Sequence, residues 1–344
     1  MIKFRGINYN AGTEYDSSVY RSDKIDLERL KKDLVLIKKL NCNVIRMYGS
    51  HIDKLILYSE KALKQGFHVW ISPRLIDGNK QQTIKFVKEA SKKAEQLRKK
   101  YRKVVFIVGN ELLIDSKAVF DAPRLFQRVD FLKSYINFKF SIKNEIPQLR
   151  QTYSSMRIFL EKTDSSIKKF VEILRMEASK NFKGQITYAS LPWEEINWNN
   201  FDIVAVNLYK NQWNASTYVD ELRKFKSFSK PIAITEFGTC AYKGASKLGG
   251  SAYDVVDYRT KTIKKGVIRD ESEQTKYLKE LIELYWKENI FATFIFDFKE
   301  EWKIHSNNPR KDLDLSSFGI VKVLKNGNVI TKKAFNVVRK LYSE

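Results

Sequence analysis

Cysteine and histidine are scarce in this chain. Its 344 residues include only Cys42 and Cys240, together with His51, His68 and His305. Two cysteines cannot form a disulfide framework, and the spacing of these five side chains matches no metal-ligand motif. The sequence therefore predicts no metal and no cofactor, and each cysteine is expected to be a small buried side chain.

Long apolar runs are absent as well. No segment of about 18 or more consecutive apolar residues occurs, so neither a transmembrane helix nor membrane insertion is expected. The first residues, MIKFRGINYN, have the pattern of a strand and contain no apolar core followed by a small-residue cleavage site. We therefore expect a cytoplasmic protein without a signal peptide.

Acidic residues are outnumbered by basic ones. The chain has 63 Lys and Arg against 40 Asp and Glu, a formal net charge of +23. Such an excess is compatible with nucleic acid, anionic lipid or an anionic substrate as partner. The lysines are spread along segments with helical periodicity, such as TIKFVKEASKKAEQLRKKYRK and IKKFVEILRMEASKNFKG. Dispersed charge of this kind is typical of a solvated helix face, so nucleic acid is not favoured as a partner.

The dominant pattern is a short β-branched run followed by an amphipathic segment. The predicted strands are IKFRGINY, NVIRMYG, FHVWISPR, VVFIVGN, QITYAS, FDIVAVNLY, PIAITEF and ATFIFDF. The predicted helices cover about residues 25–40, 52–65, 81–101, 165–181, 216–228, 271–288 and 332–341. Strands and helices alternating in this way predict a single α/β domain over 1–344, a (β/α)8 TIM barrel.

An open doubly wound sheet is the alternative, but no GxGxxG or GxxxxGK[ST] turn follows the first strand. Two long connections elaborate the predicted barrel. Residues 112–163, after strand 4, are expected to form a loop and helical insertion over the barrel mouth, and 240–269, after strand 7, a mobile lid. Near the C-terminus, the pair Asn326-Gly327 predicts a tight hairpin turn.

Two of the apolar strands end in a carboxylate. VVFIVGNELLID reaches Glu111, and KPIAITEFGTCAY reaches Glu236. A buried strand has no ordinary reason to finish on an acid, whereas the chemistry of parallel barrels lies at the C-terminal ends of their strands. Two carboxyl groups about 5 to 5.5 Å apart can cleave a glycosidic bond with retention, provided that one is kept protonated and the other ionised.

These residues resemble clan A of the retaining β-glycosidases, which includes the cellulase-like family 5, the β-1,3-glucanase family 17 and the galactanase family 53. The resemblance runs from RGINY through NVIRMYG, GNE, the strand ending at Tyr209 and TEFG to the closing strand. It implies a TIM barrel with Glu111 as the acid/base and Glu236 as the nucleophile. It also implies that Asn110 binds the sugar 2-hydroxyl.

The same resemblance implies further site residues. Arg46 would steady the nucleophile, since a nearby guanidinium favours an ionised carboxylate. Tyr209 would hydrogen-bond Glu236. The residues expected to line the sugar subsite are Tyr48, Asn8 and Trp302. Clan members commonly carry a tryptophan on the closing strand itself, whereas Trp302 lies four to five residues beyond the end of that strand. For Trp193, Trp198 and Trp213, packing is favoured over sugar stacking.

The two acids and the function of the chain each have an alternative interpretation. Glu111 could instead cap the helix that follows it, and Glu236 could form only a buried ion pair with Arg46. The predicted function is hydrolysis of a β-linked glycan or oligosaccharide through a covalent glycosyl-enzyme, with transglycosylation as a variant that the sequence does not separate. The alternative function is a non-catalytic barrel that binds a polyanion, either nucleic acid or acidic polysaccharide. No heptad or exposed apolar stripe predicts an oligomeric state.

Overall fold

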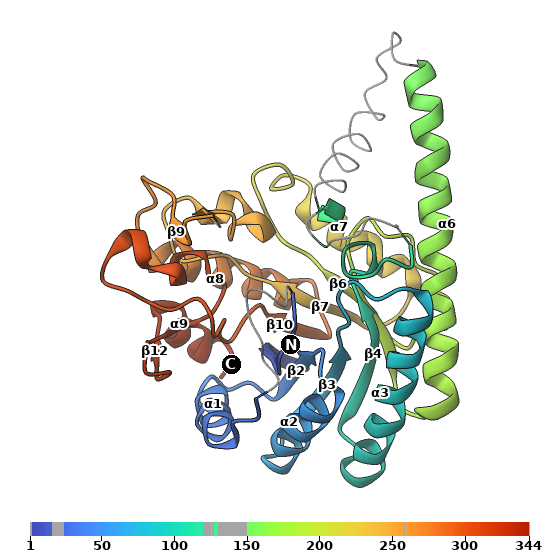
Figure 1. The fold of residues 1–344 in the computed structure, drawn as a ribbon, viewed down its shortest axis with the longest axis horizontal. Coiled ribbons are helices and arrows are strands. Elements are labelled where there is room, and N and C mark those ends of the chain that lie inside the picture. Colours follow the sequence, from blue (N-terminus) through green and yellow to red (C-terminus); the bar gives the residue numbers. More distant parts are fainter. Residues whose placement is uncertain are drawn as a thin grey trace.

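The barrel predicted from the sequence is confirmed. The computed structural model describes residues 2–15, 24–119, 125, 127–129, 150–257 and 259–343, with only the backbone described in 150–161. Parallel strands close into one barrel in the order β1-β10-β7-β6-β5-β4-β3-β2 (Figure 1). The barrel strands are β1 Phe4–Asn10, β2 Val44–Gly49, β3 His68–Pro73, β4 Val104–Asn110, β5 Ile186–Ser190, β6 Val204–Asn207, β7 Ile232–Phe237 and β10 Ala292–Ile295.

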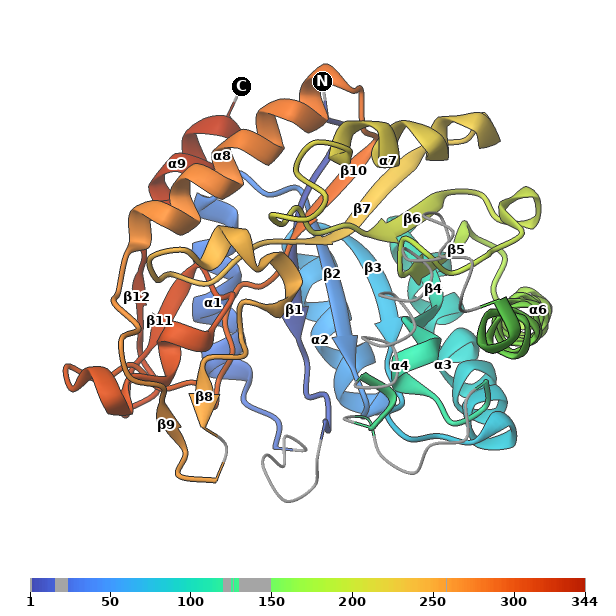
Figure 2. The same cartoon turned by 90° about the horizontal axis from the view of Figure 1, so that it is seen from above.

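Helices surround the barrel, with α3 beside α6 and α8 beside α9 (Figures 1 and 2). Their bounds are α1 Leu27–Lys39, α2 Ile52–Lys64, α3 Lys80–Tyr101, α4 Leu112–Asp115, α6 Arg150–Asn181, α7 Tyr218–Lys224, α8 Glu271–Lys287 and α9 Lys333–Leu341. Most agree with the predicted ranges to within a few residues. Helix α1 begins slightly later than predicted, because the Asp26 side chain caps it by accepting from the Arg29 N–H.

Helix α6 is the main departure from the predicted elements. It begins at Arg150, well before the predicted position 165, and its N-terminal half projects beyond the barrel (Figure 1). Residues 150–164 contain no glycine or proline, so nothing in the sequence interrupts the helix there. Most of 120–149 lies outside the described residues, so the expected insertion over the mouth stays a prediction.

The barrel interior changes from apolar to polar along the strands. At the N-terminal end, Val44 and Trp70 pack in an apolar cluster inside the barrel. Gly6 belongs to the same layer, since a Cβ there would lie 2.6 Å from the Phe294 ring. Two residues further along β2, the inward position is Arg46, while Ile45 and Met47 face the helices. The polar side chains that could take part in chemistry therefore lie at the C-terminal ends of the strands. The apolar cluster fills the barrel interior below them.

The segment 240–269 is folded around its own apolar cluster. It holds two 3₁₀ turns, Ala245–Lys247 and Gly249–Ser251, and a short antiparallel pair, β8 Val256–Asp257 with β9 Thr262–Ile263 (Figure 2). Buried Cys240, Tyr242 and Ala252 pack there against Leu315 and Phe318. Its movement as a lid stays a prediction.

The C-terminal hairpin matches its prediction. Strands β11 Val321–Val323 and β12 Val329–Thr331 pair antiparallel around Asn326-Gly327, with Gly327 at φ +80°. Both cysteines are buried, as expected. Within the described ranges, no helix is both long and apolar enough to cross a membrane.

Candidate active site

Both acid-bearing strands shift register next to the acid. The pairing of β4 with β5 is irregular between Ile107 and Asn110, and the pairing of β6 with β7 is irregular between Val206 and Asn207, just where β7 reaches Glu236. Ala233 packs inside the barrel, so in a regular strand Glu236, three residues on, would face the outer helices. A bulge re-aims a side chain in this way, and here it turns Glu236 inward.

Glu236 is held by one cation and one phenol. Arg46 Nη1 donates to its Oε1 at 2.8 Å, and the Tyr209 hydroxyl donates to its Oε2 at 2.9 Å. Glu236 is 5% exposed and Arg46 is fully buried. An ion pair this far from water is favourable only because both partners are hydrogen-bonded, and these two contacts hold the Glu236 carboxyl group in a fixed position. These are the two contacts expected from the resemblance.

Glu111 has the opposite electrostatic setting. Its Oε1 accepts from Asn207 Nδ2 at 2.8 Å, and the residue is only partly buried. Desolvation and then the negative charge of Glu236 raise the pKa of Glu111 from 4.5 to about 8, against the opposing charge of Arg74. A carboxyl group with that pKa carries a proton at neutral pH, as a general acid must.

Asn110 joins the two acids into one network. Its Oδ1 accepts from Arg46 Nη2 at 2.6 Å and from Asn207 Nδ2 at 3.2 Å. The chain of contacts from Glu236 through Arg46, Asn110 and Asn207 to Glu111 is therefore continuous. Glu111 and Glu236 lie at the same mouth, near enough for the charge of one to raise the pKa of the other.

Asn8 and Tyr48 lie in or beside this network, but both are buried. The Asn8 Oδ1 accepts from Arg46 Nη1 at 3.1 Å, and its amide donates to the Thr235 carbonyl at 2.9 Å. The Tyr48 hydroxyl donates to Asp297 Oδ2 at 2.6 Å. Both residues therefore brace neighbouring groups, and their contact with a substrate stays a prediction.

Of the tryptophans, Trp198 agrees with expectation, Trp213 does not, and the place of Trp302 in a sugar subsite stays a prediction. Trp302 lies in the loop after β10, and its described contact is with the Lys303 ammonium, 4.9 Å from its ring, rather than with either acid. Trp198 is buried, as expected. The packing expected for Trp213 is wrong, because this side chain is 71% exposed in the loop after β6.

Several site residues were not singled out in the sequence. Asn207 ends β6, Arg74 follows β3, and Asp297 follows β10. Arg74 is buried and binds Asp115 through Nε at 2.7 Å and Nη2 at 3.1 Å. The signal was the same one that identified the two acids, a polar residue where an apolar strand ends, as in VAVNLY, ISPR and FIFDF.

One cluster outside the mouth has the composition of a metal site. His305, Asp312 and Asp314 bring ligand atoms within 4.8 Å of one another. Arg269 Nη2 already lies 2.6 Å from Asp312 Oδ2 and 2.9 Å from Asp314 Oδ2, and Lys332 pairs with Asp314 at 3.0 Å. The carboxylates are thus neutralised by cations, and the cluster is better suited to holding its loops together than to binding a metal.

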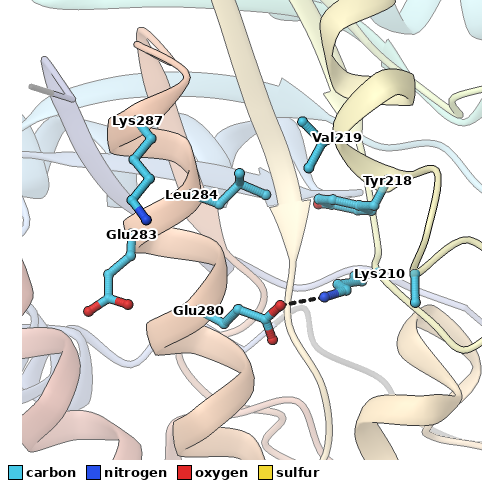
Figure 3. A pocket seen from close by; sticks show the side chains of 8 residues that line it. Lys210, Tyr218, Val219, Glu280, Glu283, Leu284 and Lys287 are labelled. Carbon is cyan, nitrogen blue, oxygen red and sulfur yellow. Dashed lines mark hydrogen bonds and ion pairs between the residues drawn. The ribbon is translucent and has the colours of Figure 1, made fainter.

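A separate surface hollow lies between α7 and α8 (Figure 3). Tyr218 and Val219 line it from one side and Leu284 from the other, and Lys210 and Glu280 form an ion pair beside it. Neither Glu111 nor Glu236 borders this hollow, so it is no part of the candidate active site.

No protein-family model and no curated protein matches this sequence. Solved structures do match its fold. A GH113 β-1,4-mannanase superimposes with a TM-score of 0.60 at 14% identity, and 100% of each chain is covered. A GH2 β-galacturonidase from Eisenbergiella tayi bound to galacturonate gives a TM-score of 0.57 at 15% identity, over 99% of this chain and 51% of that one. A β-glucuronidase from Ruminococcus gnavus in complex with uronic deoxynojirimycin gives 0.59 at 12% identity, over 99% and 50%.

These likenesses concern the fold. This chain has the closed (β/α)8 barrel found in those solved glycosidases, as the resemblance to clan A implied. It matches the mannanase over its whole length but spans about half the length of the β-galacturonidase and of the β-glucuronidase.

Proposed function

We propose that this chain is a retaining glycoside hydrolase that cleaves a β-linked glycan or oligosaccharide. The observation that carries the proposal is the opposed environment of two carboxyl groups at one barrel mouth. Glu236 is paired with Arg46, whereas the pKa of Glu111 is raised to about 8. Double displacement requires one carboxyl group that donates a proton and a second that attacks the anomeric carbon.

In the first step, Glu236 attacks the anomeric carbon while Glu111 donates its proton to the departing glycosidic oxygen. The bond to the leaving group breaks, and an ester links the sugar to Glu236. Forming the ester removes the negative charge that raises the pKa of Glu111. Glu111, having given up its proton, therefore stays ionised and can take a proton from the incoming water. Attack of that water releases the sugar with its original configuration.

The proposal leaves the identity of the substrate sugar to be determined by assay. The fold matches a protein described as a β-1,4-mannanase and others described as a β-galacturonidase and a β-glucuronidase. We therefore place β-1,4-linked mannooligosaccharides and aryl β-uronides first among the substrates to test, followed by aryl β-glucosides and β-galactosides. A sugar hydroxyl in place of water would give transglycosylation from the same intermediate.

The decisive variant is Glu236→Ala, assayed on the aryl β-glycoside that the wild type cleaves best. Hydrolysis is expected to fall by several orders of magnitude, because the nucleophile is gone. Added azide should enter the vacated space and give the α-glycosyl azide, the product of a single inversion. Full activity in Glu236→Ala would refute the proposal.

Glu288→Ala is a matched control for loss of a buried acid. Glu288 is 7% exposed, close to the 5% of Glu236, and its carboxylate is likewise paired, with Arg223 and Lys226. Its variant should keep the activity per folded molecule. A protein that cleaves none of these glycosides but binds a polyanion equally well without Glu111 and Glu236 would instead be the non-catalytic barrel.

A further inference from the structure

The backbone immediately after Glu111 is held by two buried side chains from another part of the barrel. The Leu112 N–H donates to the Tyr188 hydroxyl at 2.9 Å, and the Leu113 N–H donates to Glu194 Oε1 at 3.2 Å. Tyr188 lies on β5, and Glu194 lies in the connection that follows β5. Neither side chain belongs to the network that joins Glu111 and Glu236.

Tyr188 and Glu194 form one rigid unit. The Tyr188 hydroxyl donates to Glu194 Oε2 at 2.8 Å, and the Leu191 N–H donates to the same oxygen at 2.9 Å. Tyr188 is fully buried and Glu194 is 7% exposed. The Tyr188 hydroxyl and both carboxylate oxygens of Glu194 are therefore hydrogen-bonded, so the unit resists reorientation.

The turn that carries Glu111 needs such support. Glu111 has φ +40°, in the left-handed region, which costs a side-chain-bearing residue roughly 1–2 kcal/mol. The helix that follows, α4, has only 4 residues and cannot hold this conformation by itself. Its first N–H groups have no partner within the helix, and Tyr188 and Glu194 supply the acceptors. The left-handed turn in turn sets the direction in which the Glu111 carboxyl group projects.

We propose that Tyr188 and Glu194 are positioning residues for the acid Glu111. Their hydrogen bonds to the Leu112 and Leu113 peptides hold its carboxyl group where a glycosidic oxygen departs. The inference rests on the proposed function and adds two residues to it. Tyr188 and Glu194 orient the proton donor Glu111 through hydrogen bonds to the backbone that follows β4, without touching the substrate.

A positioning role for Tyr188 and Glu194 predicts that their loss affects substrates with poor and good leaving groups differently. A poor leaving group, such as phenoxide, needs a proton from Glu111 as its bond breaks, whereas 2,4-dinitrophenoxide departs without one. A misaimed Glu111 should therefore slow cleavage of the phenyl glycoside and spare the dinitrophenyl glycoside of the same sugar. A variant that merely unfolds part of the sample would slow both in parallel.

The test compares Tyr188→Phe and Glu194→Gln with the wild type on these two substrates, using the sugar that the wild type cleaves best among mannoside, glucoside, galactoside and glucuronide. We expect kcat/KM for the phenyl glycoside to fall roughly 10- to 100-fold, since small misplacements of a catalytic group have effects of that size. For the dinitrophenyl glycoside it should stay within about 3-fold, because the nucleophile is untouched. Unchanged ratios, or parallel losses on both substrates, would overturn the positioning role.

Two controls and a second readout complete the test. Tyr342→Phe and Glu288→Gln remove equally buried groups and should leave the ratio unchanged. The Tyr342 hydroxyl bonds to Gly6 and Thr293, and the Glu288 carboxylate pairs with Arg223 and Lys226, so neither holds the turn at Glu111. Hydrogen exchange in the peptide covering 111–115 should accelerate in the Tyr188 and Glu194 variants, and unaltered exchange would also count against the proposal. If Glu236→Ala retains full activity, the proposed function itself fails, a result that the leaving-group ratio alone would not produce.

Discussion

Replacing Glu111 by glutamine should stabilise the protein, and increasingly so as the pH rises. The pKa of Glu111 is raised from 4.5 to about 8, because burial and Glu236 both disfavour its ionised form. The native state therefore holds this proton more tightly than the unfolded state does. The resulting cost to stability is absent below about pH 4.5, grows as the pH rises toward 8 and is complete above 8.

The size of the effect follows from the pKa difference. A difference of about 3.5 units, at 1.36 kcal/mol for each unit, corresponds to about 5 kcal/mol at full ionisation. Even a third of that would shift the melting temperature by roughly 2 °C in a chain of this size. Glutamine can still accept the hydrogen bond from Asn207, so the neutral variant keeps the local geometry.

Differential scanning fluorimetry of both proteins between pH 5 and 9 measures this difference. We expect the melting temperature of Glu111→Gln to exceed that of the wild type by a margin that widens steadily up to about pH 8. Glu288→Gln is the control, because Arg223 and Lys226 lower the pKa of Glu288 to about 2. Its stabilising contribution is constant above pH 5 and is lost only in acid. A margin for Glu111→Gln that does not change with pH would refute the assignment of a raised pKa to Glu111.

Three further predictions concern the same mouth. For a phenyl glycoside, kcat/KM should fall above about pH 8, because Glu111 then loses the proton it has to donate, and a profile that is flat to pH 9.5 would contradict this. Arg46→Met should destabilise the protein by about 3–5 kcal/mol in chemical denaturation, since it leaves Glu236 buried without its cation, and a loss under about 1 kcal/mol would mean that the pair is not structural. Trp213→Ala should leave the melting temperature unchanged, because the side chain is 71% exposed, while raising KM for an oligosaccharide roughly tenfold, or about 1.4 kcal/mol, if the ring stacks on sugar. An unchanged KM would exclude that stacking.

The sequence was sufficient to predict which strands form the barrel and which acids share its mouth. The β-branched runs alternate with amphipathic segments along the chain, and this periodicity determines the (β/α)8 arrangement. Glu111 and Glu236 were predicted to meet because both end apolar strands, and the observed contacts of Arg46 and Tyr209 with Glu236 are those that the resemblance implied.

Other parts of the site depend on information that periodicity does not contain. Alternation along β7 would place Glu236 on the outer face with Ile234, and only the register shift brings it inward. Asn207, Tyr188 and Glu194 act through contacts between residues about 80 to 100 positions apart, which a single sequence does not show. The exposure of Trp213 likewise depends on how its loop folds, because composition alone favoured packing.

The central claim, that Glu236 is a nucleophile aided by Glu111, can be tested by trapping the intermediate. Incubation with 2,4-dinitrophenyl 2-deoxy-2-fluoro-β-glycosides of the cleaved sugar, followed by digestion and peptide mass spectrometry, identifies the residue that becomes covalently bound. We predict one equivalent of fluorosugar attached to Glu236 and a burst of one equivalent of dinitrophenolate. Inactivation with the label on a different residue, or turnover of the natural linkage with no trapped ester under these conditions, would contradict the account.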